Sequence, residues 1–179
     1  MPARKRFFVD TLKTPLGNEI LIADEGGALR LHYWEDPAET WRQLFRRRHG
    51  DTELVAQHDP FGHCTALERY FDGEITALDA LAVAFTGTPF QEKVWTALRT
   101  IAAGTTLSYG ALARRIGEPT AVRAVGLANG SNPIGVIVPC HRVIGSNGSL
   151  TGYGGGLPRK RWLLEHEARH SAFRLEACE

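Results

Sequence analysis

The sequence has few cysteines and no long apolar run. Its 179 residues include only three cysteines, Cys64, Cys140 and Cys178, and no two form a C-x-x-C pair. An odd number of widely spaced cysteines argues against a disulfide framework and against a thiolate zinc site, although structural zinc stays open as a minor alternative. No apolar stretch approaches the ~20 residues that span a bilayer, and the basic N-terminus lacks the apolar segment of a signal peptide. We therefore expect a cytoplasmic protein with no membrane association.

The chain also has almost no net charge, but its two halves differ. Residues 1–87 hold 10 Lys and Arg against 14 Asp and Glu, a net charge of −4, whereas residues 88–170 hold 10 against 4, a net charge of +6. Such a split indicates two units, of which the basic one faces a polyanion. A solvated basic surface explains the same numbers equally well.

The first half of the chain is typical of a small sheet with helices. The patterns predict strands over 7–12, 18–24 and 28–34, with a hairpin signal at 25–27, helices over 37–48 and 63–73, and a further strand over 80–85. We place a boundary in the Gly- and Pro-containing segment 86–89. The predicted domains are 1–86 and 87–170, with a tail over 171–179, in a mixed α/β (α+β) fold.

After the boundary the pattern changes to short helices. Pro89 is suited to the first turn of a helix that ends near Gly104, and Ser108 is suited to cap a second helix that ends at Gly117. Thr120 is predicted to cap a third helix, 121–129. Two short helices joined by a tight turn suggest a helix-turn-helix, although helical hairpins in ordinary cores look similar.

The third helix is unusually smooth. Ala121, Ala124, Gly126 and Gly130 are all small, and glycine inside a helix costs about 1 kcal/mol relative to alanine. Small side chains let a helix approach another helix or a narrow nucleic-acid groove closely. Arg123 projects from this helix, which is also what an ordinary solvent-exposed arginine does.

Cys140 follows the apolar run 134–138 and Pro139, and His141 and Arg142 come after it. The run predicts a buried strand that Pro139 ends, and residues at strand ends often carry chemistry. A nearby base or cation raises the thiolate fraction of a cysteine. Most cysteines are nevertheless inert buried residues, and adjacency of Cys and His is a weak signal.

Two further features follow Cys140. The turn-rich segment 146–156 carries the hairpin signal Asn147-Gly148 and glycines whose N–H groups could approach a ligand. Pro158 begins a last helix, in which Glu167 lies four residues after Leu163 and could orient a histidine. From spacing alone, a surface glutamate is the commoner outcome.

Several motifs in order resemble one known family. The phrases RAVGLANGSNPI, VPCHRVIG and GYGGGLPRKRWLLEHE closely resemble the O6-alkylguanine-DNA alkyltransferases, and the likeness covers residues 88–168 strongly. TPLGNEILIADEGGAL and LERYFDGE resemble phrases of the family's RNase H-like first domain. The resemblance implies an RNase H-like N-terminal domain and a mostly helical C-terminal domain with a winged helix-turn-helix-like motif.

The resemblance implies direct DNA repair. The protein would bind duplex DNA in the minor groove, flip out O6-alkylguanine or O4-alkylthymine, and transfer the alkyl group irreversibly to Cys140. His141 and Glu167 would generate the thiolate through a water, Arg123 would be the finger, Tyr109 would turn the flipped nucleotide, and Asn132 would be a hinge. Further DNA contacts are implied for Ser108, Thr120, Ala121, Ala124 and Gly126, and base-pocket contacts for Val143, Tyr153, Gly154 and Gly155.

This chain departs from the family at two positions and lacks one family feature. Val122 and Gly154 stand where some members carry alanine and serine. Since no early cysteines match the zinc site of some members, we predict no metal and no cofactor. We expect a monomer and leave cooperative assembly on DNA open.

Two other functions compete with single-turnover transfer. A damage-recognition module would bind alkylated DNA without accepting the alkyl group. A Cys-His hydrolase or acyltransferase would show many turnovers on a small ester or amide.

Overall fold

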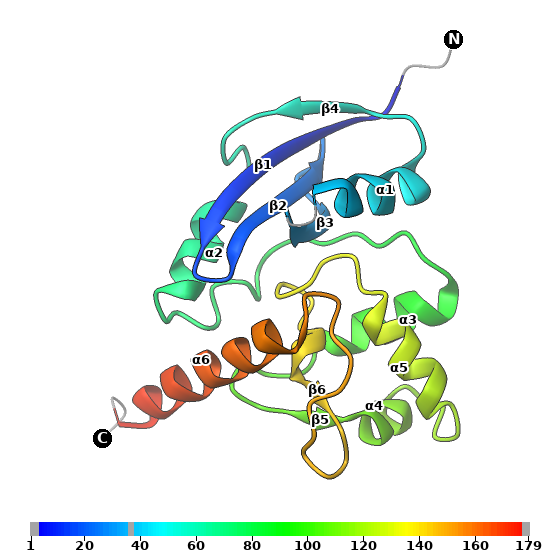
Figure 1. The fold of residues 1–179 in the computed structure, drawn as a ribbon, viewed down its shortest axis with the longest axis vertical. Helices are drawn as coiled ribbons and strands as arrows, with labels where there is room; N and C mark the ends of the chain where they lie inside the picture. The colour runs from blue at the N-terminus through cyan, green and yellow to red at the C-terminus, as the bar shows by residue number, and fades with distance from the viewer. Residues whose placement is uncertain (1–3, 36–37, 177–179) are drawn as a thin grey trace.

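The computed structural model describes residues 4–35 and 38–176. The N-terminal half is built on a four-stranded sheet (Figure 1) with the order β3-β2-β1-β4. Its strands are β1 (Arg6–Thr14), β2 (Gly17–Asp24), β3 (Leu29–Trp34) and β4 (Glu53–Ala56). The first three pair antiparallel and β4 runs parallel to β1. The predicted strands and hairpin are confirmed, whereas β4 was not predicted.

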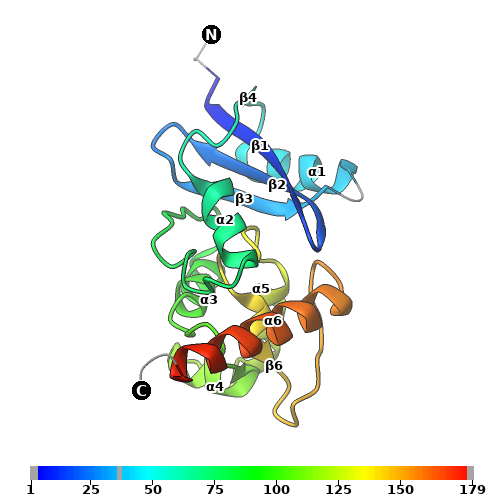
Figure 2. The same cartoon turned by 90° about the vertical axis from the view of Figure 1, so that its left-hand side faces the viewer.

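Both faces of this sheet are buried. Alternate residues of a strand point to opposite faces, so Ile20 and Ile22 pack with Trp41 of α1 (Ala38–His49). Leu21 on the other face joins the main core together with Leu67 of α2 (His63–Phe71). That main core also contains the C-terminal helices, which places the second half of the chain directly beneath β2 and β3 (Figure 2).

Residues 80–85 do not form the strand that was predicted. Only Val83 makes a bridge, to Leu29, and the backbone of Leu29 bonds to Ala82 and Ala84. The preceding carbonyl of Leu81 instead accepts a hydrogen bond from Arg99, at 3.1 Å. A guanidinium therefore satisfies backbone that a sheet partner would otherwise have to satisfy.

The C-terminal half begins with three helices: α3 (Pro89–Leu98), α4 (Tyr109–Arg115) and α5 (Val122–Gly130). Thr88 and Gln91 form a reciprocal capping box at the start of α3, with Pro89 in its first turn. Ser108 caps α4 as predicted, since its Oγ accepts from the N–H of Ala111 at 3.1 Å. A short parallel ladder joins β5 (Leu107–Ser108) to β6 (Val143–Ile144).

The predicted cap at Thr120 is wrong. The N-cap of α5 is Ala121, which makes no side-chain capping bond, and Thr120 is exposed. The helix starts one residue later than predicted: Ala121 lies outside the helical conformation, and its carbonyl accepts the first intrahelical bond, from the N–H of Val125.

The apolar run 134–138 is buried as predicted, but it is not a strand. It forms a series of turns in which Val136 adopts a φ of 64° and the N–H of Val138 bonds to the carbonyl of Ile134. Asn132 bridges the two ends of the run, donating to the carbonyl of Val138 at 2.8 Å and accepting from the N–H of Ile134 at 3.0 Å. This side chain takes the place of a sheet neighbour. A 3₁₀ helix, η1 (Cys140–Arg142), follows.

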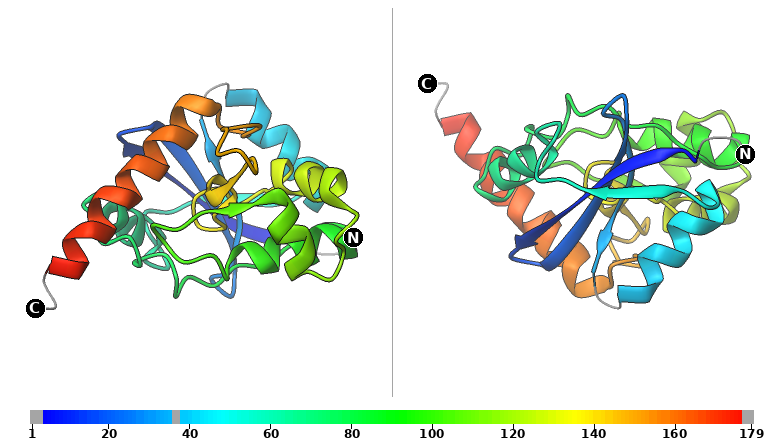
Figure 3. Two further views of the ribbon diagram at one scale, coloured as in Figure 1. Left: turned by 90° about the horizontal axis from the view of Figure 1, so that it is seen from below. Right: turned by 90° about the horizontal axis from the view of Figure 1, so that it is seen from above.

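The last helix, α6 (Leu157–Glu176), runs outward on the side opposite α5 (Figures 1 and 3). It continues past residue 170, so the predicted start of a tail falls inside a helix. Cys178 lies outside the described residues. The mixed α/β class is confirmed, while the division at residues 86–87 stays a prediction. No helix among the described residues is long and apolar enough to cross a membrane.

Candidate active site

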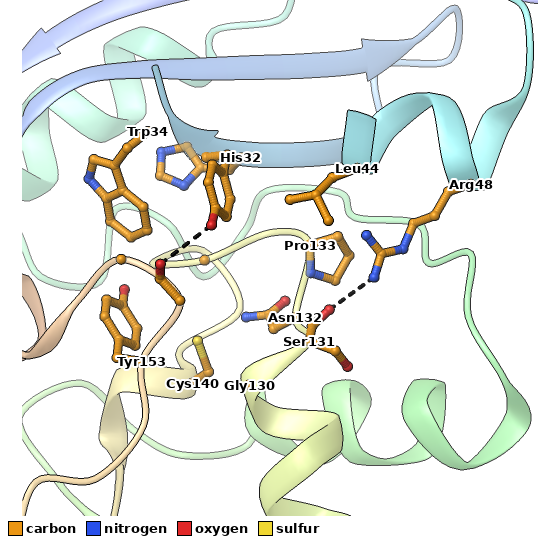
Figure 4. Close-up of a pocket in the computed structure, with 14 residues that line it drawn as sticks. His32, Trp34, Leu44, Arg48, Gly130, Ser131, Asn132, Pro133, Cys140 and Tyr153 are labelled. Carbon is orange, nitrogen blue, oxygen red and sulfur yellow. Dashed lines mark hydrogen bonds between the residues drawn. The ribbon is translucent and has the colours of Figure 1, made fainter. Parts of the chain in front are cut away.

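Cys140 lies at the wall of a cavity between the two halves of the chain. The cavity holds about 150 Å³, and the Cys140 side chain points into it from between Asn132 and Tyr153 (Figure 4). Cys140 is 5% exposed. It is the first residue of η1 and does not follow the strand that was predicted. Turns on both sides of Pro139 aim the side chain into the cavity.

The N-terminal half supplies much of the cavity wall, which the sequence did not indicate. These residues come from β3 and α1: His32, Tyr33, Trp34, Leu44 and Arg48. Side-chain bonds that join the halves here run from Tyr33 to the carbonyl of Gly154, at 3.4 Å, and from Arg48 to the carbonyl of Ser131, at 3.0 Å. The N–H of His32 also donates to the carbonyl of Pro133, at 2.9 Å. The two halves therefore form the cavity together.

Three predicted pocket residues line this cavity: Tyr153, Gly154 and Gly155. A Cβ at Gly155 would lie within 2.4 Å of the Trp34 ring, so glycine is what allows the loop to pack there. Val143 was predicted for the pocket but does not line it. Its side chain is fully buried in the core, and its carbonyl accepts a hydrogen bond from Lys160.

Buried polar atoms without a partner among the described residues lie around the cavity. They are His32 Nδ1, Trp34 Nε1 and Tyr153 Oη. Burial raises the pKa of Tyr153 well above its ordinary value, so its hydroxyl stays protonated. An unsatisfied buried donor or acceptor is costly, and all three atoms belong to residues of the cavity wall.

Behind Cys140, Glu167 is the centre of a buried hydrogen-bond cluster. Its Oε1 accepts from His141 Nε2 at 2.9 Å, Tyr70 Oη at 2.8 Å and Arg142 Nη2 at 2.8 Å. Its Oε2 accepts from Arg142 Nε at 3.0 Å and from the N–H of Gly104 at 3.1 Å. Glu167 is 1% exposed, so the surface glutamate that spacing alone favoured is excluded.

The cluster sets the charge of its members. Burial alone would raise the pKa of Glu167, but the hydrogen bonds from His141 and Arg142 and the positive charge of Arg142 hold it well below its usual range. Burial lowers the pKa of His141 despite the attraction of Glu167. A neutral His141 that donates from Nε2 leaves Nδ1 with a free lone pair, and this atom has no partner among the described residues.

The Cys140 thiol is protonated in this resting arrangement. Burial raises its pKa, while the Asn132 side chain and the charge of Lys160 act in the opposite direction. Lys160 was missed by the sequence analysis. It is fully buried and donates to the carbonyls of Val143, at 2.6 Å, and Thr151, at 3.0 Å.

The predicted DNA-contact residues lie in or directly before α4 and α5. Tyr109 donates to the carbonyl of Thr151 at 3.0 Å, which ties the start of α4 to the cavity loop. On α5, Arg123 and Ala124 are exposed, and Ala121 and Gly126 are half-buried. Leu127, missed by the sequence analysis, is 78% exposed on the same helix. This part of the surface therefore carries small residues, one cation, and two exposed apolar side chains, Val122 and Leu127.

No group of three or more His, Cys, Asp or Glu side chains suited to a metal ion occurs within residues 4–35 and 38–176. Fold and site together define a protein with a small sheet packed on a helical half, and with one cysteine in a cavity backed by a His-Glu pair.

Comparison with known proteins identifies the family. Residues 89–169 match the family model described as 6-O-methylguanine DNA methyltransferase, DNA binding domain. The methylated-DNA–protein-cysteine methyltransferase of Shigella flexneri is 48% identical over 164 residues, covering 90% of this chain and 96% of the relative. That of Mycolicibacterium paratuberculosis is 57% identical over 139 residues, covering 76% and 84%. The chain belongs to the methylated-DNA–protein-cysteine methyltransferase family.

Solved structures of the same family have a similar fold. The crystal structure of Mycobacterium tuberculosis OGT in complex with DNA has a TM-score of 0.77 at 43% identity, covering 92% of this chain and 94% of that one. The O6-methylguanine-DNA methyltransferase of Pyrococcus kodakaraensis strain KOD1 has a TM-score of 0.62 at 23% identity, covering 90% and 98%, and supports the fold alone.

Proposed function

We propose that this protein repairs DNA by transferring the alkyl group of O6-alkylguanine, and of O4-alkylthymine, to Cys140. The observation that carries the proposal is the position of the Cys140 thiol. It opens on a cavity with unsatisfied polar atoms, and the buried His141–Glu167 pair lies behind it. The relatives named for this activity support the same chemistry.

The residues suggest how the proton and the electrons move. The Cys140 sulfur attacks the alkyl carbon, an S–C bond forms, the C–O6 bond breaks, and its electron pair leaves with guanine. The thiol proton passes to Nδ1 of His141, directly or through water, and the Glu167 carboxylate stabilises the imidazolium. The thioether product has no labile bond, so each molecule reacts once.

DNA is the partner that the matched DNA-binding domain supports. The basic half, with its net charge of +6, would face the phosphates. In this proposal α5 enters the minor groove through Ala121, Ala124 and Gly126, with Arg123 in the gap left by the flipped base. Phosphate and backbone contacts would come from Ser108, Tyr109 and Thr120, and the flipped base would meet Tyr153, Gly154 and Gly155.

Three further properties belong to the proposal. The protein acts as a monomer, needs no cofactor, and works in the cytoplasm. Asn132 keeps the turn 134–138 in place beside the thiol, as its two hydrogen bonds allow.

The test is the intact mass after incubation with a duplex that carries one O6-methylguanine. We expect a stoichiometric gain of about 14 Da, mapped to Cys140. Cys140→Ser should bind this DNA and gain nothing. Cys64→Ser is the matched control and should react fully, because burial and the neighbouring Asp10 raise the pKa of Cys64 well above its ordinary value. Tight binding without any mass gain would refute transfer and would instead identify a damage-recognition module.

A further inference from the structure

Tyr70 reaches the reactive cluster from the other half of the chain. It lies on α2, is fully buried, and donates its hydroxyl to Glu167 Oε1 at 2.8 Å. A second contact fixes it, since His166 of α6 bonds to the carbonyl of Tyr70 at 2.7 Å. Helix α2 therefore lies against α6 (Figure 2), where Tyr70 and Phe71 contact the rings of His166 and Trp162.

The hydroxyl of Tyr70 shares one oxygen with His141. Glu167 Oε1 accepts from Tyr70, His141 and Arg142, and Oε2 accepts from Arg142 and Gly104. A carboxylate offers about four lone-pair sites, so these donors saturate it. Each donor on Oε1 withdraws charge that would otherwise attract the proton of His141.

We propose that Tyr70 is a positioning residue of the reaction, whose hydroxyl holds Glu167 Oε1 and thereby limits the basicity of His141. Tyr70 acts through Glu167. The proposal rests on the proposed function, because that function gives His141 its role as base. Burial and the nearby Glu167 raise the pKa of Tyr70 well above its ordinary value, so the hydroxyl remains a donor throughout the working pH range.

Other charged or titratable groups also face this cluster and remain in place when the tyrosine hydroxyl is removed. They come from η1, α6 and β2: Cys140, Arg142, Lys160, His166 and Glu19. A change in the pH–rate profile on removal of the Tyr70 hydroxyl can therefore be assigned to that hydroxyl.

The test is Tyr70→Phe, which keeps the ring and removes only the hydroxyl. The carboxylate then attracts the His141 proton more strongly, so the acid limb of the pH–rate profile should move up by about 0.5 to 1 pH unit. The profile is measured twice, once for methyl transfer from O6-methylguanine duplex and once for iodoacetamide alkylation of Cys140 followed by peptide mapping. Replacing Tyr70 alone with 3-fluorotyrosine, whose hydroxyl is a stronger hydrogen-bond donor, should move the acid limb below that of the wild type.

Phe71→Leu is the matched control, because Phe71 packs beside Tyr70 and bonds nothing in the cluster. It should lower the melting temperature and leave the midpoint of the acid limb unchanged. An unchanged midpoint in folded Tyr70→Phe, or a rate loss equal at every pH, would overturn the proposal. If wild-type protein accepts no methyl group, the proposed function fails, while the iodoacetamide profile still decides the role of Tyr70.

Discussion

Glu167→Gln should destabilise the protein as well as slow its chemistry. Glu167 is 1% exposed and Arg142 is 4% exposed, and the two meet at 2.8 and 3.0 Å. Glutamine keeps the size of the side chain but carries no charge. The guanidinium of Arg142 would keep its bond to the carbonyl of Ile101 and lose its counter-charge inside the core.

The magnitude follows from the burial of both partners. Removing one member of a buried pair costs about 3 to 5 kcal/mol, because the other charge is left uncompensated. In a chain of this length each 1 kcal/mol lowers the melting temperature by about 2 to 4 °C, so we expect a fall of roughly 6 to 20 °C. Glu165→Gln is the matched control on the exposed side of the same helix, and it should stay within about 0.5 kcal/mol of wild type.

The pH dependence gives a second check of the same reasoning. The folded-state pKa of Glu167 lies below its ordinary value of 4.5, so its contribution to stability is present above pH 4.5 and lost as the pH falls below it. The difference in unfolding free energy between wild type and Glu167→Gln should therefore shrink between pH 6 and pH 3.

The assay is urea denaturation of wild type, Glu167→Gln and Glu165→Gln at each pH, with methyl transfer measured in parallel. Transfer by Glu167→Gln should slow at least about tenfold, because His141 loses the carboxylate that stabilises its charged form. A loss of stability below about 1 kcal/mol, or one that is the same at pH 6 and pH 3, would refute the buried ion pair as its cause.

Three further variants test other parts of the molecule. Lys160→Met removes the buried ammonium near Cys140, so the pKa of the thiol should rise and iodoacetamide alkylation of Cys140 should need higher pH; an unshifted profile would exclude this electrostatic support. Arg123→Ala should change stability by less than about 0.5 kcal/mol yet slow repair of duplex more than of single-stranded DNA; equal losses would contradict a finger role. Burial and the nearby cations Arg30, Arg48 and Lys5 lower the pKa of His49 to about 4, so stability should fall as the pH drops from 6.5 to 4. His49→Gln should flatten that fall in urea denaturation, and an unchanged slope would assign the loss to other groups.

The sequence predicted the elements that local chemistry determines. The cap at Ser108, the helix start at Pro89 and the turn at 25–27 depend on neighbouring residues only, and each is found in the structure. The spacing of Glu167 from Leu163 allowed an inward-facing carboxylate, since residues four apart share a helix face, and both are buried. Spacing alone nevertheless favoured a surface glutamate, because it does not show what packs against that face.

The errors lie where a side chain bonds backbone groups that a sheet partner would otherwise bond. Residues 134–138 have the composition of a buried strand, but the amide of Asn132 satisfies the ends of the run and allows turns. At 80–85 the guanidinium of Arg99 takes a carbonyl that a strand would have used. Burial was predicted correctly in the first case because both conformations bury the same apolar residues.

The largest omission was the part played by the N-terminal half. Trp34 and Arg48 lie in no recognised phrase, and the phrase LERYFDGE, which contains Tyr70, was given no role in the site. The matched DNA-binding domain covers only residues 89–169, and these three residues lie outside it. Trp34 and Arg48 line the cavity in front of Cys140, and Tyr70 bonds the carboxylate behind it. The thiol is therefore enclosed from both sides by residues of the first half. In the function proposed here, that half helps to set both the space for the alkyl group and the basicity of His141.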